Sequence, residues 1–243
     1  MKKFFYTAFI SLVIIPVSLH AGSIGGVTTQ GEGKWGVGAE IDWNFESDLE
    51  LDKIDLGLAV EDVEAEDQYN IAIKGVYGLT NNIDIYAKLG YMDFSNTGNL
   101  PALGNFDADA DADFSYAIGA KGAFPADYGI VYGADFQYQW SKNDIDISVA
   151  AISDQGEVDF KKWHVAPFIA KPMETMTPYA GFKYTQAKYE HDFDTLGAIE
   201  FENEDEWGLF LGSDIMVDER TTANVELRLL DETAITAGLT YKY

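Results

Sequence analysis

The strongest constraint on the fold is the alternation of residue types in the last stretch of the chain, from Thr233 to Tyr243. Successive side chains of an extended strand point to opposite faces. One face of this stretch carries small or polar residues, and the other is apolar, with Ile235, Ala237, Leu239, Tyr241 and Tyr243. The period of two predicts a β-strand that runs to the last residue and pairs with a strand from earlier in the chain.

The N-terminus has the pattern of a secretory signal peptide. Lys2 and Lys3 precede an apolar run over residues 4–17, and Ala21 stands at the expected cleavage site. The run of about 14 residues is too short for a helix that spans a membrane. We expect residues 1–21 to be removed and residues 22–243 to form one exported domain. The chain has no cysteine, which excludes a disulfide framework and a lipid anchor at the cleavage site.

The same alternation recurs along the rest of the chain and predicts nine further strands. In the first of them, aromatic residues stand at both ends of the apolar row, at Trp35 and at Trp43 and Phe45. Ten residues of strand at a tilt of about 40° project to about 25 Å, the height of the apolar band of a membrane barrel. The predicted strands cover residues 34–45, 68–78, 83–92, 114–124, 130–140, 162–171, 177–189, 207–217 and 223–229.

These strands predict an all-β fold, a transmembrane antiparallel up-and-down β-barrel of ten strands. Eight strands are the alternative, if a weak pair belongs to the loops. Because a spanning sheet must satisfy its own backbone hydrogen bonds, the sheet has to close on itself. We expect short periplasmic turns, both termini in the periplasm, and long extracellular loops at residues 46–67, 93–113, 141–160 and 190–206.

Two motifs resemble those of a known group of proteins. The segment from Tyr77 to Tyr91, YGLTNNIDIYAKLGY, is similar to the strand, turn and strand unit of small bacterial outer-membrane β-barrels of the OmpA type and the opacity type. The C-terminal strand resembles the last strand of the same proteins. The resemblance implies a place in the outer membrane, contact with its lipid and lipopolysaccharide, and reading of Tyr241 and Tyr243 by the barrel-assembly machinery.

The charge is concentrated in the four predicted loops. They contain 28 of the 41 acidic residues but only Lys53 and Lys142 as basic residues, whereas the predicted strands and turns are nearly neutral. A formal net charge of −25 also argues against a nucleic-acid partner, because phosphates demand a basic surface. The distribution therefore predicts one strongly acidic end of the barrel.

Twelve charged residues are predicted to line the barrel interior: Glu40, Asp42, Lys74, Asp84, Lys88, Lys121, Asp135, Lys183, Asp214, Glu226, Arg228 and Lys242. They either pair into a network that fills the interior or line a narrow aqueous channel. Ten strands are close to the number at which side chains alone fill a barrel, and both signs of charge are present, so we favour the filled interior. This predicts a structural or surface-interaction role, with a narrow porin-like channel as the alternative.

The run DADADAD is the candidate metal site. If it is extended, Asp107, Asp109, Asp111 and Asp113 present their carboxylates on one side. Oxygen ligands suit Ca²⁺ or Mg²⁺, although acidic runs are commonly solvated loops that bind no ion. We expect no other cofactor.

An enzyme is the least favoured class. Outer-membrane hydrolases need a base and a nucleophile or water in register. The candidate bases are His164 on an inward face and His191 beside Asp192 and Asp194, and neither has a recognisable serine partner. We therefore predict a barrel without enzymatic activity, with an outer-membrane hydrolase as the remaining alternative.

Overall fold

The computed structural model describes residues 23–54, 61–100, 104–149, 152–193 and 197–243. Within these ranges almost the whole chain is antiparallel β-sheet. No helix among the described residues is long and apolar enough to cross a membrane.

Ten strands form a closed ring in which each strand pairs with its neighbours, and β1 pairs with β11 to close it. This confirms the predicted up-and-down barrel of ten strands. The ring consists of β1 (Trp35–Ile54), β2 (Glu61–Gly78), β3 (Ile83–Leu100), β4 (Gly104–Pro125), β5 (Val131–Val149), β6 (Ile152–Ala170), β7 (Met176–Phe193), β9 (Trp207–Met216), β10 (Thr221–Leu229) and β11 (Thr233–Lys242).

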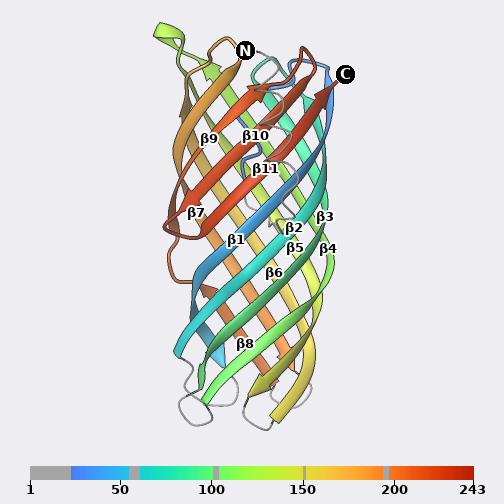
Figure 1. Ribbon diagram of the computed structural model, residues 1–243, viewed down its shortest axis with the longest axis vertical. Helices are drawn as coiled ribbons and strands as arrows, with labels where there is room; N and C mark the ends of the chain where they lie inside the picture. Colours follow the sequence, from blue (N-terminus) through green and yellow to red (C-terminus); the bar gives the residue numbers. More distant parts are fainter. Residues whose placement is uncertain (1–22, 55–60, 101–103, 150–151, 194–196) are drawn as a thin grey trace, which may run out of the picture.

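An eleventh strand, β8 (Gly197–Asn203), gives the barrel two levels. It pairs with the far ends of β7 and β1, beyond the point where β9, β10 and β11 end. We call the ring of ten strands the base and the narrower ring of eight, β1 to β8, the extension. Figure 1 shows the base in the upper part of the view and the extension below it.

The outer wall of the base is apolar and carries aromatic residues at two levels. Trp35 contacts Tyr77 near one end, with ring centroids 4.5 Å apart. Near the other end, Tyr184 contacts both Trp163 and Trp207, at 5.6 and 5.1 Å. Apolar residues between the two levels, such as Ile71 and Ile73, are about 60% exposed and face outward. This is the predicted outward row of a barrel that faces lipid.

The predicted boundaries of the four long loops were wrong. Strands β1 to β7 continue through most of residues 46–67, 93–113, 141–160 and 190–206, and β8 lies within the last of these segments. Residues 55–60, 101–103, 150–151 and 194–196 fall outside the described residues. The alternation with a period of two persists in these segments, but the outward face carries acidic residues in place of apolar ones. A strand of this composition is difficult to distinguish from an acidic loop by sequence.

The inside of the extension is an apolar core. Phe94, Phe160 and Tyr189 lie against one another, with ring centroids between 4.9 and 6.3 Å apart, and each is at least 97% buried. Phe106, Ile145 and Val158 belong to the same cluster. Because a ring of eight strands is just wide enough for side chains to fill, this core closes the barrel at the level of the extension.

Pro167 lies within β6, where a proline commonly marks a bulge, but no bulge occurs here. The pairs Asp135↔Ala166, Ala134↔Pro167 and Gly133↔Phe168 keep one register between β5 and β6. The pairing with β7 resumes in the same register at Phe168↔Gly181. Proline removes one donor from the ladder, and here the sheet accommodates that loss without an inserted residue.

The extension should lose stability when its core is hollowed. We expect Phe94→Ala to lower the free energy of unfolding of the extension by about 3–5 kcal/mol, because the substitution removes a fully buried ring and leaves a cavity. Amide hydrogen exchange measures this for the extension separately from the base. Asp107→Ala, at an exposed position of the same level, is the matched control. Equal protection in the two variants would contradict the packed core.

Candidate functional site

The structure places the twelve predicted interior residues on the inward face of the base. Eleven of them are more than 90% buried, and Lys242, at the end of β11, is half-buried. They make two charged clusters and a set of contacts with the N-terminal segment.

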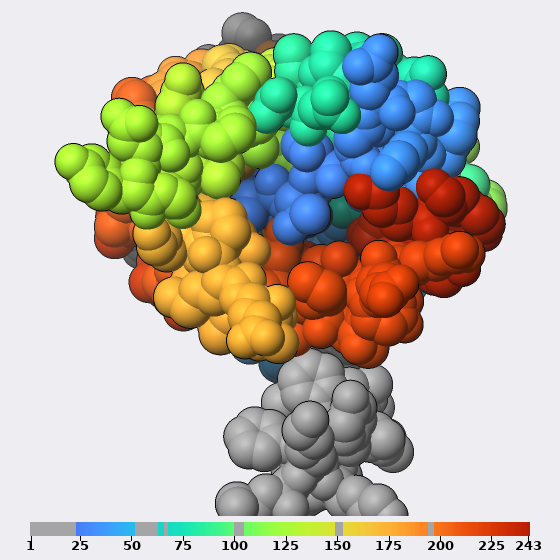
Figure 2. All heavy atoms as spheres, turned by 90° about the horizontal axis from the view of Figure 1, so that it is seen from above, coloured from blue at the N-terminus to red at the C-terminus, as the bar shows by residue number. Residues whose placement is uncertain are grey.

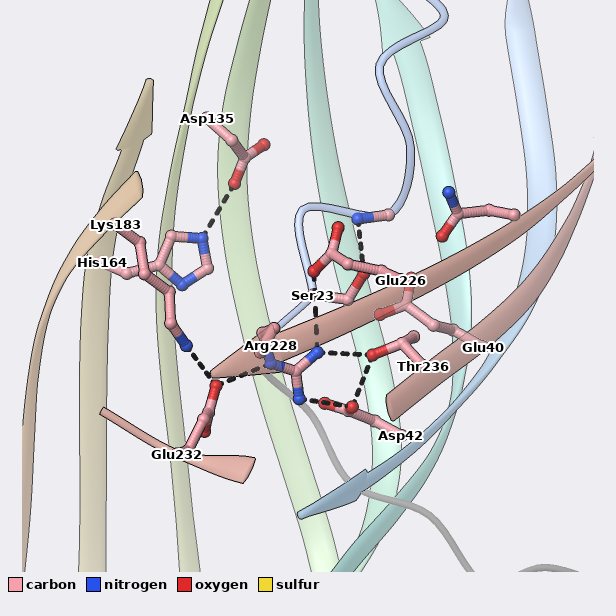
Figure 3. Close-up of polar contacts among 12 residues, drawn as sticks. Ser23, Glu40, Asp42, Asp135, His164, Lys183, Glu226, Arg228, Glu232 and Thr236 are labelled. Carbon is pink, nitrogen blue, oxygen red and sulfur yellow. Dashed lines mark hydrogen bonds and ion pairs between the residues drawn. The ribbon is translucent and has the colours of Figure 1, made fainter. Parts of the chain in front are cut away.

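The first cluster is centred on Arg228 of β10 (Figure 3). Its Nη2 lies 2.6 Å from Asp42 Oδ1, and its Nε lies 2.6 Å from Glu232 Oε1. Its Nη1 donates to Thr236 Oγ1, which in turn donates to the same oxygen of Asp42. Thr236, Asp42 and Arg228 lie on β11, β1 and β10, so the cluster ties together the strands that close the ring.

Sequence reasoning missed the carboxylates at the tip of the β10–β11 hairpin. Two acidic residues between two predicted strands are typical of an exposed tight turn, but Asp231 and Glu232 are both buried. Glu232 binds Lys183 and also Lys162, whose Nζ lies 2.7 Å from Oε2. The preceding Leu230 adopts a positive φ of 85° and turns the following residues inward. The sequence has no glycine here that would signal this turn.

The second cluster contains Glu40 and two lysines. Lys88 Nζ lies 2.6 Å from Glu40 Oε1, and Lys74 Nζ lies 3.2 Å from Oε2. On the opposite wall, Asp135 Oδ1 accepts a hydrogen bond from the Tyr86 hydroxyl at 2.8 Å and lies 3.1 Å from His164 Nε2. All these side chains are at least 93% buried, and a buried charge is costly unless it is paired.

The N-terminal segment comprises residues 23–34, and its first part, residues 23–30, lies inside the base. Ser23, Ile24 and Val27 are at least 97% buried, and the two apolar ones pack in a cluster with Phe168 and Phe210 of the barrel wall. Figure 2, which looks into the end of the barrel with the short turns, shows this segment in blue in the middle of the ring. We call this end the turn end. The segment plugs the interior there, which the sequence analysis did not foresee.

Charged residues of the wall hold the backbone of this segment. Lys88, Lys74 and Lys121 donate to the carbonyl oxygens of Ser23, Gly25 and Gly26, at 3.2, 3.2 and 2.7 Å. Asp214 Oδ2 accepts from the amides of Val27 and Thr28 at 3.0 and 2.8 Å, and Asp84 accepts from the amide of Gln30. Part of the interior charge is therefore satisfied by backbone dipoles rather than by opposite charges.

Two glycines make this close contact possible. Gly25 and Gly26 have positive φ values of 63° and 85°, which residues with a side chain rarely adopt. A Cβ atom at Gly25 would lie 2.3 Å from Lys74 Nζ, and one at Gly26 would lie 2.3 Å from Asp214 Oδ1. In the sequence, the pair Gly25-Gly26 after the expected cleavage site is the feature that could have indicated a segment packed closely against the barrel wall.

The two candidate histidines are both buried. His164 faces the interior of the base beside Asp135. His191 lies inside the extension, where its Nε2 is 3.3 Å from Asn96 Nδ2 and its ring contacts Phe193 and Phe201. Burial lowers the pKa of His191 to about 3. Its predicted neighbour Asp192 is exposed on the other face of the strand, and Asp194 falls outside the described residues.

The four aspartates of DADADAD lie on the outward face of β4 in the extension, all exposed, with Ala108 and Ala110 facing the core. Alternate residues of a strand are about 6.6 Å apart along it, so their carboxylates are spread in a row. Among the described residues, the group of three acidic side chains whose oxygens all lie within 4.8 Å of one another consists of Glu46, Asp48 and Glu64. A cation at Asp107, Asp109, Asp111 and Asp113 stays a prediction.

Tyr241 and Tyr243, the predicted assembly signal, both face outward, with ring centroids 5.0 Å apart. The amide of Tyr243 donates to the carbonyl of Trp35 at 2.9 Å, so the last residue takes part in closing the ring.

Comparison with known proteins identifies solved structures that share the fold. A scan against protein-family models finds no match, and a search of curated proteins finds no match either. Among solved structures, the outer-membrane protease OmpT from Escherichia coli aligns with a TM-score of 0.52 at 12% identity, over 91% of this chain and all of that one. The translocator domain of the autotransporter NalP from Neisseria meningitidis aligns with a TM-score of 0.50 at 11% identity, over 90% of this chain and 91% of that one. The fold is that of the outer-membrane β-barrels.

Arg228 should be essential for a stable ring. Arg228→Met keeps the volume but leaves Asp42 and Glu232 buried without their shared cation, which costs about 3–5 kcal/mol. We expect a lower thermal midpoint, measured by the temperature at which the folded band of the detergent-refolded protein is lost in gel electrophoresis. The other arginine of the chain, Arg220, is exposed, and Arg220→Met is the control. Equal midpoints for the two variants would contradict the assigned role.

The extension should weaken as the pH falls, because the buried His191 excludes a proton that an ordinary histidine binds. Its pKa is about 3 in the folded extension and about 6.5 when exposed. The contribution of the neutral His191 to the free energy of unfolding is therefore fully present above pH 6.5. It decreases progressively below that pH, by about 2 kcal/mol at pH 5. Hydrogen exchange of the extension at pH 5 and pH 7, corrected for intrinsic rates, measures this. His191→Gln should flatten the dependence, and an unchanged dependence in that variant would assign it to other groups.

Proposed function

We propose that this protein is an integral outer-membrane barrel that conducts no solute and presents its acidic extension at the cell surface. The observation that carries the proposal is the double closure of the interior. The N-terminal segment occupies the lumen of the base at the turn end, and the apolar core around Phe94 and Phe160 fills the extension. A structural or surface-interaction role then belongs to the outer face of the extension.

The membrane placement is part of the proposal. The outward apolar band between the two aromatic levels matches the lipid-facing band of a barrel, with lipid and lipopolysaccharide as its neighbours. The acidic extension would stand outside the cell, and the turn end with both termini would face the periplasm. Export would use the signal peptide, cleaved after Ala21, and the assembly machinery would read Tyr241 and Tyr243.

A narrow channel is the main alternative, because charged residues of both signs line the base. Conduction would require the N-terminal segment to leave the lumen and the apolar core of the extension to open. The latter is the larger obstacle, since that core joins residues from all of β1 to β8. An outer-membrane hydrolase is a weaker alternative. OmpT, which shares the fold, is a protease, but His164 and His191 are both buried here, away from any large substrate.

Planar-bilayer recording of refolded residues 22–243 tests the proposal. We expect insertion without discrete current steps. A variant that lacks residues 23–31 should also stay silent, because the extension core remains closed. Current steps in the full chain that change in size with Lys88→Gln or Asp135→Asn would instead establish a lumenal channel. Steps in the shortened variant alone would show that the N-terminal segment is the single barrier and that the extension conducts.

A further inference from the structure

The N-terminal segment lies in the base with its first described residue innermost. Thr29 Oγ1 donates to the Asn81 carbonyl at 3.0 Å, and the amide of Glu32 donates to Asn81 Oδ1, so this part of the segment lies at the turn between β2 and β3. Ser23, in contrast, is fully buried, and its carbonyl accepts from Lys88 at 3.2 Å. Figure 3 shows Ser23 at the inner end of the segment. The chain therefore runs from the interior of the base to the turn end before β1 begins.

The lumen beyond Ser23 is a dead end. The Arg228 cluster ties β10 to β1 there, and the apolar core around Phe94 closes the extension. At the turn end, the free space beside the segment is a cavity of about 330 Å³, the liquid volume of about ten waters. The apolar run of the signal peptide, residues 4–17, does not fit into that space. The segment can therefore take its place only with a free end, which enters from the turn end.

The described interior of the base lacks one positive charge. Its buried carboxylates are those of Glu40, Asp42, Asp84, Asp135, Asp214, Glu226, Asp231 and Glu232, and its buried cations are Lys74, Lys88, Lys121, Lys162, Lys183 and Arg228. Half-buried Lys242 is one more cation, yet with neutral histidines the carboxylates still exceed the cations by one. Since a buried carboxylate without a counter-charge is costly, this interior favours one further cationic group.

Two of these carboxylates lie near the inner end of the segment. Lys88 Nζ binds both the Ser23 carbonyl and Glu40 Oε1, so Glu40 lies next to the innermost residue. Figure 3 shows Glu226 in the same part of the lumen. Glu226 Oε1 has no hydrogen-bond donor among the described residues, and Arg228 Nη1, at 3.6 Å, is beyond hydrogen-bond distance. A cationic group at the end of the chain would stand beside carboxylates that need it.

The backbone of the segment makes most of its polar contacts with the wall. Lysines of β2, β3 and β4 donate to three of its carbonyl oxygens, and Asp84 and Asp214 accept from three of its amides. Residues 23–30, SIGGVTTQ, contain no charged side chain. The charge that this segment can bring into the lumen is therefore that of its amino terminus.

We propose that the base is a binding site for a free amino terminus, and that its ligand is the segment that begins at Gly22 after cleavage behind Ala21. The α-ammonium supplies the missing positive charge beside Glu40 and Glu226, and the wall holds the backbone that follows. The segment binds in the lumen only after the signal peptide has been removed, so cleavage completes the fold of the base. This inference rests on the cleavage that belongs to the proposed function, but not on the closure of the barrel to solutes.

A single thiol tests the proposal, because the chain contains no cysteine. Val27→Cys replaces a buried side chain by another small apolar one, and Glu32→Cys, at an exposed position of the same segment, is the matched control. Each variant is refolded in detergent micelles, once as residues 22–243 and once with an extension of about ten Gly, Ser and Asn residues before Gly22, more than the cavity can hold.

In the chain that begins at Gly22, we expect a water-soluble maleimide to label Val27→Cys at least about tenfold more slowly than Glu32→Cys. In the extended chain the two thiols should react at similar rates, because the segment stays outside the lumen. A site-specific protease that restores Gly22 as the first residue should also restore the protection. Equal protection of Val27→Cys in the two chains would overturn the proposal.

The charge of the amino terminus is tested separately from its position. Transamination of the unfolded Val27→Cys chain with pyridoxal phosphate converts the α-ammonium of Gly22 into a neutral carbonyl group and leaves the lysine side chains intact. After refolding, we expect labelling about fivefold to tenfold faster than in the untreated chain, because the carboxylates have lost their counter-charge. An unchanged labelling rate would overturn the ammonium as the ligand. Neither measurement needs a membrane or a current, so both outcomes are separate from that of the bilayer recording.

Discussion

The structure depends on the pairing of β1 with β11. The two strands share a ladder from Gly36↔Lys242 to Glu46↔Thr233, and the amide of Tyr243 extends it to Trp35. Without that ladder both strands would be open edges, which a lipid environment does not tolerate, because unpaired backbone groups find no water there. The Arg228 cluster adds side-chain contacts across the same seam, from β10 through β11 to β1.

Closure creates an interior that water cannot fill freely, and every polar group there needs a partner. In the base, the polar groups find partners in two ways. Arg228, Glu232 and Lys183 pair with opposite charges, whereas Lys121 and Asp214 bind the backbone of the N-terminal segment. The second arrangement makes the segment part of the folded barrel. Between the segment and the wall it leaves a cavity of about 330 Å³ at the turn end.

The change from ten strands to eight gives the molecule its second level. Where β9, β10 and β11 end, β8 takes their place between β7 and β1. The narrower ring holds apolar side chains in place of charges, with Phe94 and Phe106 facing inward and Asp107 and Asp109 facing outward. The surface that we propose to be presented to the outside is therefore an acidic wall of paired strands rather than a set of acidic loops.

The sequence by itself determined the barrel, and it predicted the ten strands and the inward direction of the twelve charged residues of the base. These features follow from the alternation of residue types with a period of two, which can be read from neighbouring residues in the sequence. Three features were decided by the tertiary structure: the strands that continue into the acidic segments, the inward turn of Asp231 and Glu232, and the N-terminal segment in the lumen. Each depends on which residues become neighbours across the closed ring, and no local sequence pattern specifies those neighbours. Asp214, for example, accepts hydrogen bonds from the amides of Val27 and Thr28, nearly 190 residues away in the chain.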